Sequence, residues 1–212
     1  MRRTRHRTDH HRSTFRLFRG AALGALLAAG LPAAADAQPR QLSGAPVAAV
    51  RALTPTLRLE ADLAERTLYV WAGDSLLHLF PVAVGKAGHA TPTGSFTIDR
   101  VIWNPGWVPP DAKWARGKRA RGPEDADNPM QAVKLFFREP DYYIHGTNRP
   151  ETVGSAASHG CLRMRPADAA ALARLVMEHG GEPRDAAWVA ETLRARTTRT
   201  VRLPMRVAMT VE

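Results

Sequence analysis

The stretch RTLYVWAGDSLLHLFPVAV, residues 66–84, decides the fold class of this chain. Its first part alternates, so that Leu68 and Val70 lie on one face of an extended segment, as in a half-buried strand. A turn around Gly73 follows, and the remaining residues return as the second strand of a β-hairpin. Pro81 lacks the amide N–H that an inner strand needs, so we expect it at a sheet edge or a bulge.

Beyond the hairpin, strand patterns continue and helix patterns come late. Pro166 suits a first helical position, an apolar run to Met177 follows, and Gly180-Gly181 ends that helix. The other predicted elements are strands at residues 94–103, 133–137, 142–145, 198–203 and 206–211 and a helix at residues 185–194. This order predicts a mainly β domain of the α+β class, with one or two helices packed at one end.

The N-terminal residues 1–37 have the three parts of a secretory signal peptide. A basic segment precedes the apolar run 21–35, and Ala35-Asp36-Ala37 supplies a small-residue cleavage site. The run is shorter than the roughly 20 residues of a membrane-spanning helix. An uncleaved anchor is the alternative. We expect export to the periplasm or cell wall and no membrane attachment after cleavage.

The rest of the chain divides into a flexible lead-in, residues 38–56, and one catalytic domain, residues 57–212. Inside that domain, residues 104–128 form a long, charged segment rich in Pro and Gly, which we expect to cover a functional site. Its basic run 113–121 is either a solvated loop or a contact to an anionic ligand. No function is assigned to the tail, residues 187–212.

The basic character of the chain does not indicate nucleic-acid binding. The formal net charge is +10, and half of it lies in residues 1–37, which hold seven Arg against two Asp. Because that segment is a targeting signal and export separates the protein from DNA, we expect no nucleic-acid partner. A mildly basic exported domain suits an anionic polymer such as a cell wall.

Cys161 is the single cysteine of the chain, so it has no partner for an internal disulfide. An odd cysteine in an exported protein indicates an intermolecular bond or a reactive thiol. The alternative is a small buried apolar side chain. The sequence around Cys161 favours the reactive thiol.

A nucleophilic thiol needs a nearby base, and two histidines are available. His159 lies two residues before Cys161, at a poor angle for proton transfer, so it suits a role in shaping the site. His145 ends a predicted strand sixteen residues earlier, and the intervening loop can return its imidazole to the sulfur. Gly146 offers a carbonyl that would fix the imidazole tautomer. Gly160 permits a sharp turn whose backbone N–H would face an oxyanion.

These residues belong to a series of blocks that resembles the L,D-transpeptidase family, with a catalytic domain of the YkuD type. The blocks are Ser158-His159-Gly160-Cys161-Leu162-Arg163-Met164, His145-Gly146-Thr147, Thr91-Pro92-Thr93-Gly94-Ser95-Phe96-Thr97-Ile98 after Val84-Gly85-Lys86, and Asn104-Pro105 with Trp107 and Pro109-Pro110. They follow the family's order from about Leu57 to Asp168.

The resemblance implies a mixed-sheet β-sandwich and crosslinking of peptidoglycan stem peptides without a metal or cofactor. Cys161 would attack the peptide bond before a terminal D-Ala, with His145 as base and then acid. Gly146 would orient the imidazole, and N–H groups around Gly160 and Cys161 would form the oxyanion hole. The residues expected to line the substrate site are Arg163, Ser158 and His159.

Three alternatives remain open at this stage. Water could resolve the same thioester, which would make the protein an L,D-carboxypeptidase or a hydrolase that detaches proteins from the wall. A zinc site could form from His145, His159 and Cys161, although their spacing matches no usual zinc pattern. A wall-binding module without activity is the third, and the intact Cys/His pair argues against it. Neither the acyl acceptor nor the oligomeric state follows from the sequence.

Overall fold

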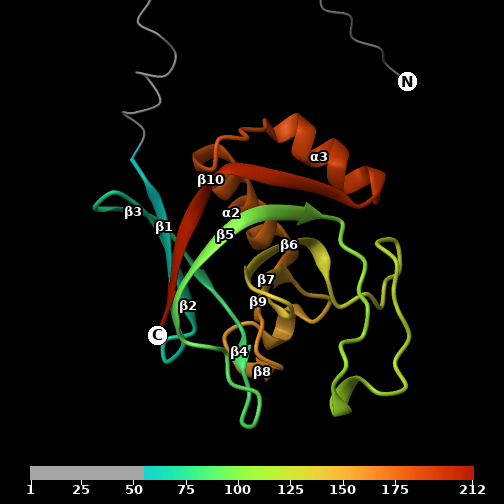
Figure 1. Cartoon of the computed structure of the whole chain (residues 1–212). Helices are drawn as coiled ribbons and strands as arrows, with labels where there is room; N and C mark the ends of the chain where they lie inside the picture. Colours follow the sequence, from blue (N-terminus) through green and yellow to red (C-terminus); the bar gives the residue numbers. More distant parts are fainter. Residues whose placement is uncertain (1–54) are drawn as a thin grey trace, which may run out of the picture. The chain divides into compact units, whose positions relative to one another are not determined.

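The computed structural model describes residues 55–212 (Figure 1). The predicted signal peptide, residues 1–37, lies outside the described residues, and so does the predicted lead-in except for Pro55 and Thr56. Within the described part, no helix is both long and apolar enough to cross a membrane.

The described chain is built mainly from strands. They are β1 (Leu57–Asp62), β2 (Thr67–Ala72), β3 (Ser75–Pro81), β4 (Val84–Gly85), β5 (Gly94–Trp103), β6 (Gln131–Arg138), β7 (Tyr142–Gly146), β8 (Ala156–Ser158), β9 (Leu162–Met164) and β10 (Arg199–Val211). Two α-helices come late, α2 (Pro166–His179) and α3 (Ala186–Ala195), and two 3-10 turns are η1 (Lys113–Ala115) and η2 (Pro150–Thr152). The predicted class, mainly β with helices late in the chain, is confirmed.

Eight of the strands form one mixed sheet in the order β3-β2-β1-β10-β5-β6-β7-β9, and β4 pairs with β8 separately. The pairs β1–β10 and β7–β9 are parallel, and the other pairs of the large sheet are antiparallel. Figure 1 shows β5 and β10 as long, curved strands that run side by side. The β7–β9 end of the sheet carries the candidate site.

The hairpin that the sequence predicted is β2–β3. Leu68 and Val70 are both fully buried, as the alternation required. Gly73, at φ +57°, takes the turn in the left-handed region, which costs glycine little. Pro81 ends β3, which is an edge strand of the large sheet, so its missing N–H interrupts no inner ladder.

The end of the chain differs from the prediction of two closing strands. Residues 199–211 form the single strand β10, whose register shifts between Arg202 and Val207. Pro204 lies inside this irregularity, and Met205 N–H there donates to the carbonyl of Gly180 instead of to a strand. The break in the sequence pattern is therefore a bulge and not a turn. Strand β10 lies at the centre of the sheet, between β1 and β5.

One apolar core joins both halves of the sheet to α2. It includes Leu59 from β1, Leu135 from β6 and Leu172 from α2, each almost fully buried. Helix α2 begins two residues after β9 and packs against β6 and β7, so it supports the site strands from the core side. Helix α3 is capped by Asp185, whose carboxylate accepts from the Trp188 N–H at 2.7 Å.

Candidate active site

Two parallel strands place the predicted catalytic residues on one face of the sheet. In the β7–β9 ladder, Ile144 is paired with Leu162 and His145 with Arg163. Ile144 and Leu162 are fully buried in the core. Since side chains alternate along a strand, His145 and Arg163 point to the opposite face. Cys161 directly precedes β9, on the same side as Arg163.

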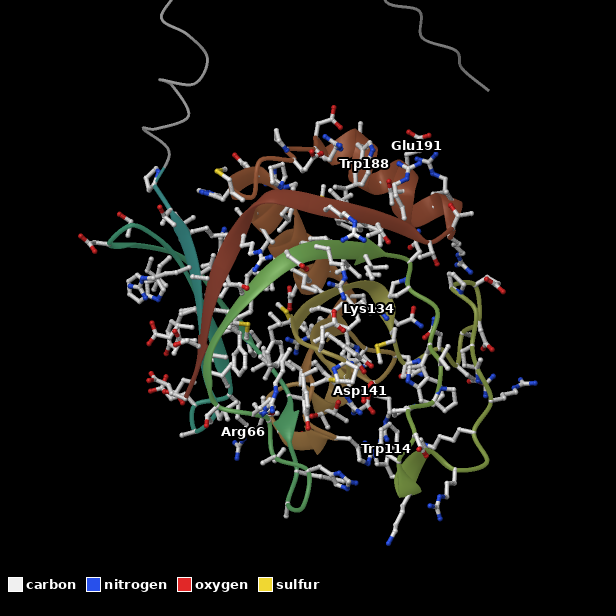
Figure 2. The ribbon with its side chains drawn as sticks, viewed as in Figure 1. Arg66, Trp114, Lys134, Asp141, Trp188 and Glu191 are labelled. Carbon is white, nitrogen blue, oxygen red and sulfur yellow. The ribbon has the colours of Figure 1, made fainter. Side chains whose placement is uncertain are left out.

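A cleft of about 1100 Å³ opens over this face. It is lined by four of the predicted site residues, Cys161, His145, His159 and Arg163. The segment 104–128, predicted to cover the site, contributes residues to the same cleft, including Trp107, Lys113, Trp114, Lys118 and Arg121. Figure 2 labels Trp114 of this segment and Asp141, which directly precedes β7; both residues line the cleft.

The His145 imidazole is held in one orientation and one tautomer. It is 2% exposed, and its Nδ1 lies 2.7 Å from the carbonyl oxygen of Gly146. A carbonyl can only accept, so Nδ1 carries the proton and Nε2 keeps the lone pair that a base needs. Burial lowers the pKa of His145 to about 3; the Gly146 carbonyl opposes this effect, and the charge of Arg163 adds to it. The imidazole is therefore neutral at neutral pH.

The Cys161 thiol is also neutral at rest. Its Sγ lies 3.2 Å from the carbonyl oxygen of Asp141, which accepts the thiol proton. Burial raises the pKa of Cys161 to about 11, although hydrogen bonds from Tyr143 to the sulfur, through its backbone N–H and its hydroxyl, oppose the rise. Because Cys161 and His145 are both neutral, no thiolate is present at rest, and the thiol needs a base at the moment of attack.

The turn before Cys161 depends on glycine and serine. Gly160 has φ +110°, and a Cβ there would lie 2.7 Å from the Tyr142 ring. Its N–H donates to Ser158 Oγ at 3.0 Å. Ser158 is fully buried and does not line the cleft, so the structure places it beneath the turn. Because the Gly160 N–H is engaged, the Cys161 N–H is the remaining donor of the two expected to form an oxyanion hole.

Gly146 is required by close packing. A Cβ on this residue would overlap the backbone carbonyl oxygen of Gln131 on β6. Any larger residue would push β7 away from β6 and move the carbonyl that orients His145. Gly146 itself does not line the cleft.

His159 lies in an aromatic stack that joins the segment 104–128 to the turn before Cys161. Its ring is parallel to that of Trp114 at 3.9 Å between centroids, and His89 packs edge-on at 4.6 Å. Burial lowers the pKa of His159 to about 4, with a smaller contribution from Lys86. A neutral ring is suited to stacking on indole, and the sequence alone did not reveal this contact.

Arg163 is a half-buried cation that lines the cleft beside Cys161. Its nearest recorded hydrogen-bond acceptor is the carbonyl oxygen of Ala157, at 3.4 Å. Within residues 55–212, no carboxylate lies at ion-pair distance from it. Its predicted role, the binding of a substrate carboxylate, stays a prediction.

Sequence reasoning missed three residues that contact or border the catalytic pair: Tyr143, Asp141 and Lys134. Tyr143 lies two residues before His145, so the period of a strand would have placed it on the same face. Lys134 is on β6, and only the strand pairing brings it opposite His145. In the part of the chain that is described, no group of three or more His, Cys, Asp or Glu residues could hold a metal ion. The zinc ligand set considered from the sequence is thus not assembled there.

Comparison with known proteins agrees with this geometry. The model of the YkuD family, the L,D-transpeptidase catalytic domain, matches residues 57–202. The chain belongs to the L,D-transpeptidase family. The YkuD protein of Bacillus licheniformis, named as an L,D-transpeptidase, is 34% identical over 119 residues, which are 56% of this chain and 59% of that protein. The ErfK/SrfK protein of Escherichia coli K12, also named as an L,D-transpeptidase, is 34% identical over 115 residues, 50% of this chain and 37% of that protein.

The L,D-transpeptidase domain therefore spans little more than half the length of the first relative and less of the second. Among solved structures, an L,D-transpeptidase from Mycobacterium smegmatis matches 74% of this chain and 59% of its own, at 16% identity and a TM-score of 0.46. The catalytic domain of the Enterococcus faecium L,D-transpeptidase matches 76% of this chain and 99% of its own, at 15% identity and a TM-score of 0.45.

Proposed function

We propose that this protein is a peptidoglycan L,D-transpeptidase that crosslinks stem peptides through a Cys161 thioester and releases D-Ala. The observation that carries the proposal is the placement of His145 on β7 and of Cys161 directly before the neighbouring parallel strand β9, where both line one cleft. The substrate class and the catalytic roles follow from the resemblance to the family, and the geometry of the cleft supports them.

In the first half-reaction, Cys161 Sγ attacks the carbonyl carbon of the bond between the third stem residue and D-Ala. Its proton passes to Nε2 of His145, the ring nitrogen that carries no proton when Nδ1 donates to the Gly146 carbonyl. The C–N bond then breaks, and the proton moves from His145 to the departing amine of D-Ala. The products are free D-Ala and a thioester on Cys161.

In the second half-reaction, an amine of a neighbouring stem attacks the thioester. The amine gives a proton to His145, a new amide bond forms, the C–S bond breaks, and the proton returns to Cys161. The chemistry is a transfer between two acyl acceptors and needs no oxidant or other co-reactant. In each half-reaction the tetrahedral oxyanion would be held by the Cys161 N–H.

The charge of the cleft supports an anionic peptide as substrate. Lys86, Arg149 and Arg163 line the walls near the nucleophile, and stem peptides carry free carboxylates. Of these three, Arg149 forms an ion pair with Glu151, whereas Arg163 has no such partner in the described chain. Arg163 is therefore the first candidate to bind a stem carboxylate through two parallel N–H bonds.

The proposed site of action is the periplasm or the cell wall, reached through the signal peptide predicted at residues 1–37. The support for this is the sequence pattern and the location of the substrate.

The test is incubation of the full chain with purified tetrapeptide muropeptides, read by mass spectrometry, beside Cys161→Ala. We expect loss of D-Ala together with a crosslinked dimer, and neither product from the variant. A short incubation should also reveal the protein with one acyl tripeptide attached. Loss of D-Ala that yields only tripeptide would contradict the transpeptidase and indicate a hydrolase. No turnover by the wild type, with an active control enzyme in parallel, would contradict both.

A further inference from the structure

A cation lies beside the catalytic pair without lining the cleft. Lys134 is on β6, between β5 and β7 in the sheet, and its Cα is paired with that of His145 (Figure 2). Paired residues of neighbouring strands point to the same side, so the Lys134 side chain shares the face of His145. It is half-buried and absent from the cleft lining.

The Lys134 ammonium is held by aromatic rings and not by an ion pair. Its Nζ lies 4.9 Å from the centroid of the Phe136 ring and 5.3 Å from that of Tyr143. Both distances are within the range of a cation–π interaction. Across residues 55–212, no carboxylate lies within ion-pair distance of it. A half-buried charge without a counter-ion is costly, so an anion that forms nearby is strongly favoured.

Of the groups that surround Lys134, the Cys161 sulfur is the one that can become the favoured anion. From β5, Arg100 repels the ammonium, and the carboxylate of Glu139 is already bound to Arg100. From β7, His145 is neutral and the Tyr143 phenol stays protonated, since burial raises its pKa. Directly before β9, a Cys161 thiolate would attract the ammonium, and Arg163 on β9 adds a second positive charge.

We propose that Lys134 is a positioning residue for the reaction proposed above. Its ammonium favours the Cys161 thiolate and adds to the effect of burial in keeping the His145 imidazole neutral. Tyr143 joins the two groups, because its ring lies under the ammonium and its hydroxyl bonds to the sulfur. The role rests on the proposed function, but it concerns the resting enzyme and can be measured without substrate. Lys134 acts through these neighbours and does not touch the substrate.

Two consequences follow for the thiol–imidazole pair. The positive charge stabilises sulfur as its proton leaves, which lowers the barrier to attack. The same charge disfavours an imidazolium, so the proton that His145 takes is passed on readily to the departing amine. Removal of the charge should therefore shift both titrations in the alkaline direction, a result that loss of packing alone does not predict.

The test is the rate of Cys161 alkylation by iodoacetamide. Cys161 is the only cysteine in the chain, so the mass of the full-length protein reports this one thiol. The proteins to compare are the wild type, Lys134→Met, Lys134→Arg and, as a matched control, Arg138→Met. Arg138 is an exposed cation four residues along β6 that lies over Tyr142, so the control removes the same charge outside the pair.

Between pH 7 and 9 we expect Lys134→Met to react roughly three- to tenfold more slowly than wild type, because a pKa rise of about one unit cuts the thiolate tenfold while each thiolate becomes more nucleophilic. Lys134→Arg should restore most of the rate, and Arg138→Met should keep it. A wild-type rate in a folded Lys134→Met, or the same loss in Arg138→Met, would overturn the proposal.

A second variant decides the matter if Lys134→Met does not fold. Tyr143→Phe keeps the ring under the ammonium and removes the hydroxyl that bonds to the sulfur. We expect slower alkylation in this variant as well. An unchanged rate would contradict the proposed role of Tyr143 in linking Lys134 to the Cys161 sulfur. Because alkylation needs no stem peptide, a failure here is distinct from a failure of the muropeptide assay.

Discussion

Substitution of His145 by Gln should remove a specific part of the pH dependence of stability. His145 is 2% exposed, and burial lowers the pKa of its imidazole from 6.5 to about 3 in the folded protein. Below pH 6.5 the unfolded chain binds a proton at this residue and the folded chain does not. Stability that is present above pH 6.5 is therefore lost as the pH falls towards 3.

The size of the effect follows from the two pKa values. Between pH 8 and pH 5 the wild type should lose about 2 kcal/mol of unfolding free energy through His145, since each pH unit below 6.5 costs about 1.4 kcal/mol. The interval lies above the usual range of carboxylate titration. His159 also has a lowered pKa, but it is present in both proteins and cancels in the comparison.

Urea unfolding at pH 8 and pH 5 measures the difference directly. The wild type should lose about 2 kcal/mol more than His145→Gln over this interval, whatever the variant's stability at pH 8. His78→Gln, which removes an exposed imidazole from β3, controls for the loss of a histidine as such. Equal losses of unfolding free energy in the wild type and His145→Gln would mean that the folded protein accommodates a His145 imidazolium. The conclusion that His145 is neutral at rest would then be wrong.

Three further predictions concern the turn, the covering segment and the cleft charge. Gly160→Ala should destabilise the fold by about 1–3 kcal/mol more than Gly154→Ala in thermal melts, because both are left-handed glycines but only Gly160 has a ring in the path of a Cβ. Trp114→Ala removes the stack on His159, so it should raise KM for muropeptides more than it lowers kcat. It should also speed proteolysis within residues 104–128. Unchanged cleavage would contradict the idea that this segment covers the cleft. Arg163→Gln should raise KM roughly tenfold for stems with free carboxylates and much less for amidated ones, and equal effects on both would contradict carboxylate binding.

The sequence was informative about the fold wherever local patterns determine the structure. Alternation located β2 and β5, and Pro166 with Gly180 bounded α2 correctly. It was misleading at Pro204, because a bulge and a turn both interrupt alternation and only the partner strands distinguish them. The short strands β8 and β9 have three residues each, too few to show a period, so they were not predicted.

The central position of β10 was also beyond local reasoning. A strand's neighbours are set by long-range packing, and nothing in residues 199–211 identifies β1 and β5 as partners. The residues of the candidate site likewise fall into those that local sequence reveals and those that only long-range packing reveals. Cys161 and His145 were found from the chemistry of their own neighbourhoods, whereas Lys134 enters the site only through the register of β6 against β7.

The cations around the catalytic pair bear on both halves of the proposed reaction. An attacking amine must be unprotonated, and amines in solution at neutral pH are mostly ammonium ions. Lys134 and Arg163 create a positive potential that already disfavours the imidazolium of His145. The same potential disfavours an ammonium group that approaches the thioester, so the acceptor loses its proton on entry. A site in which positive charge adds to burial in keeping the base neutral is thereby also suited to receive an amine as the nucleophile.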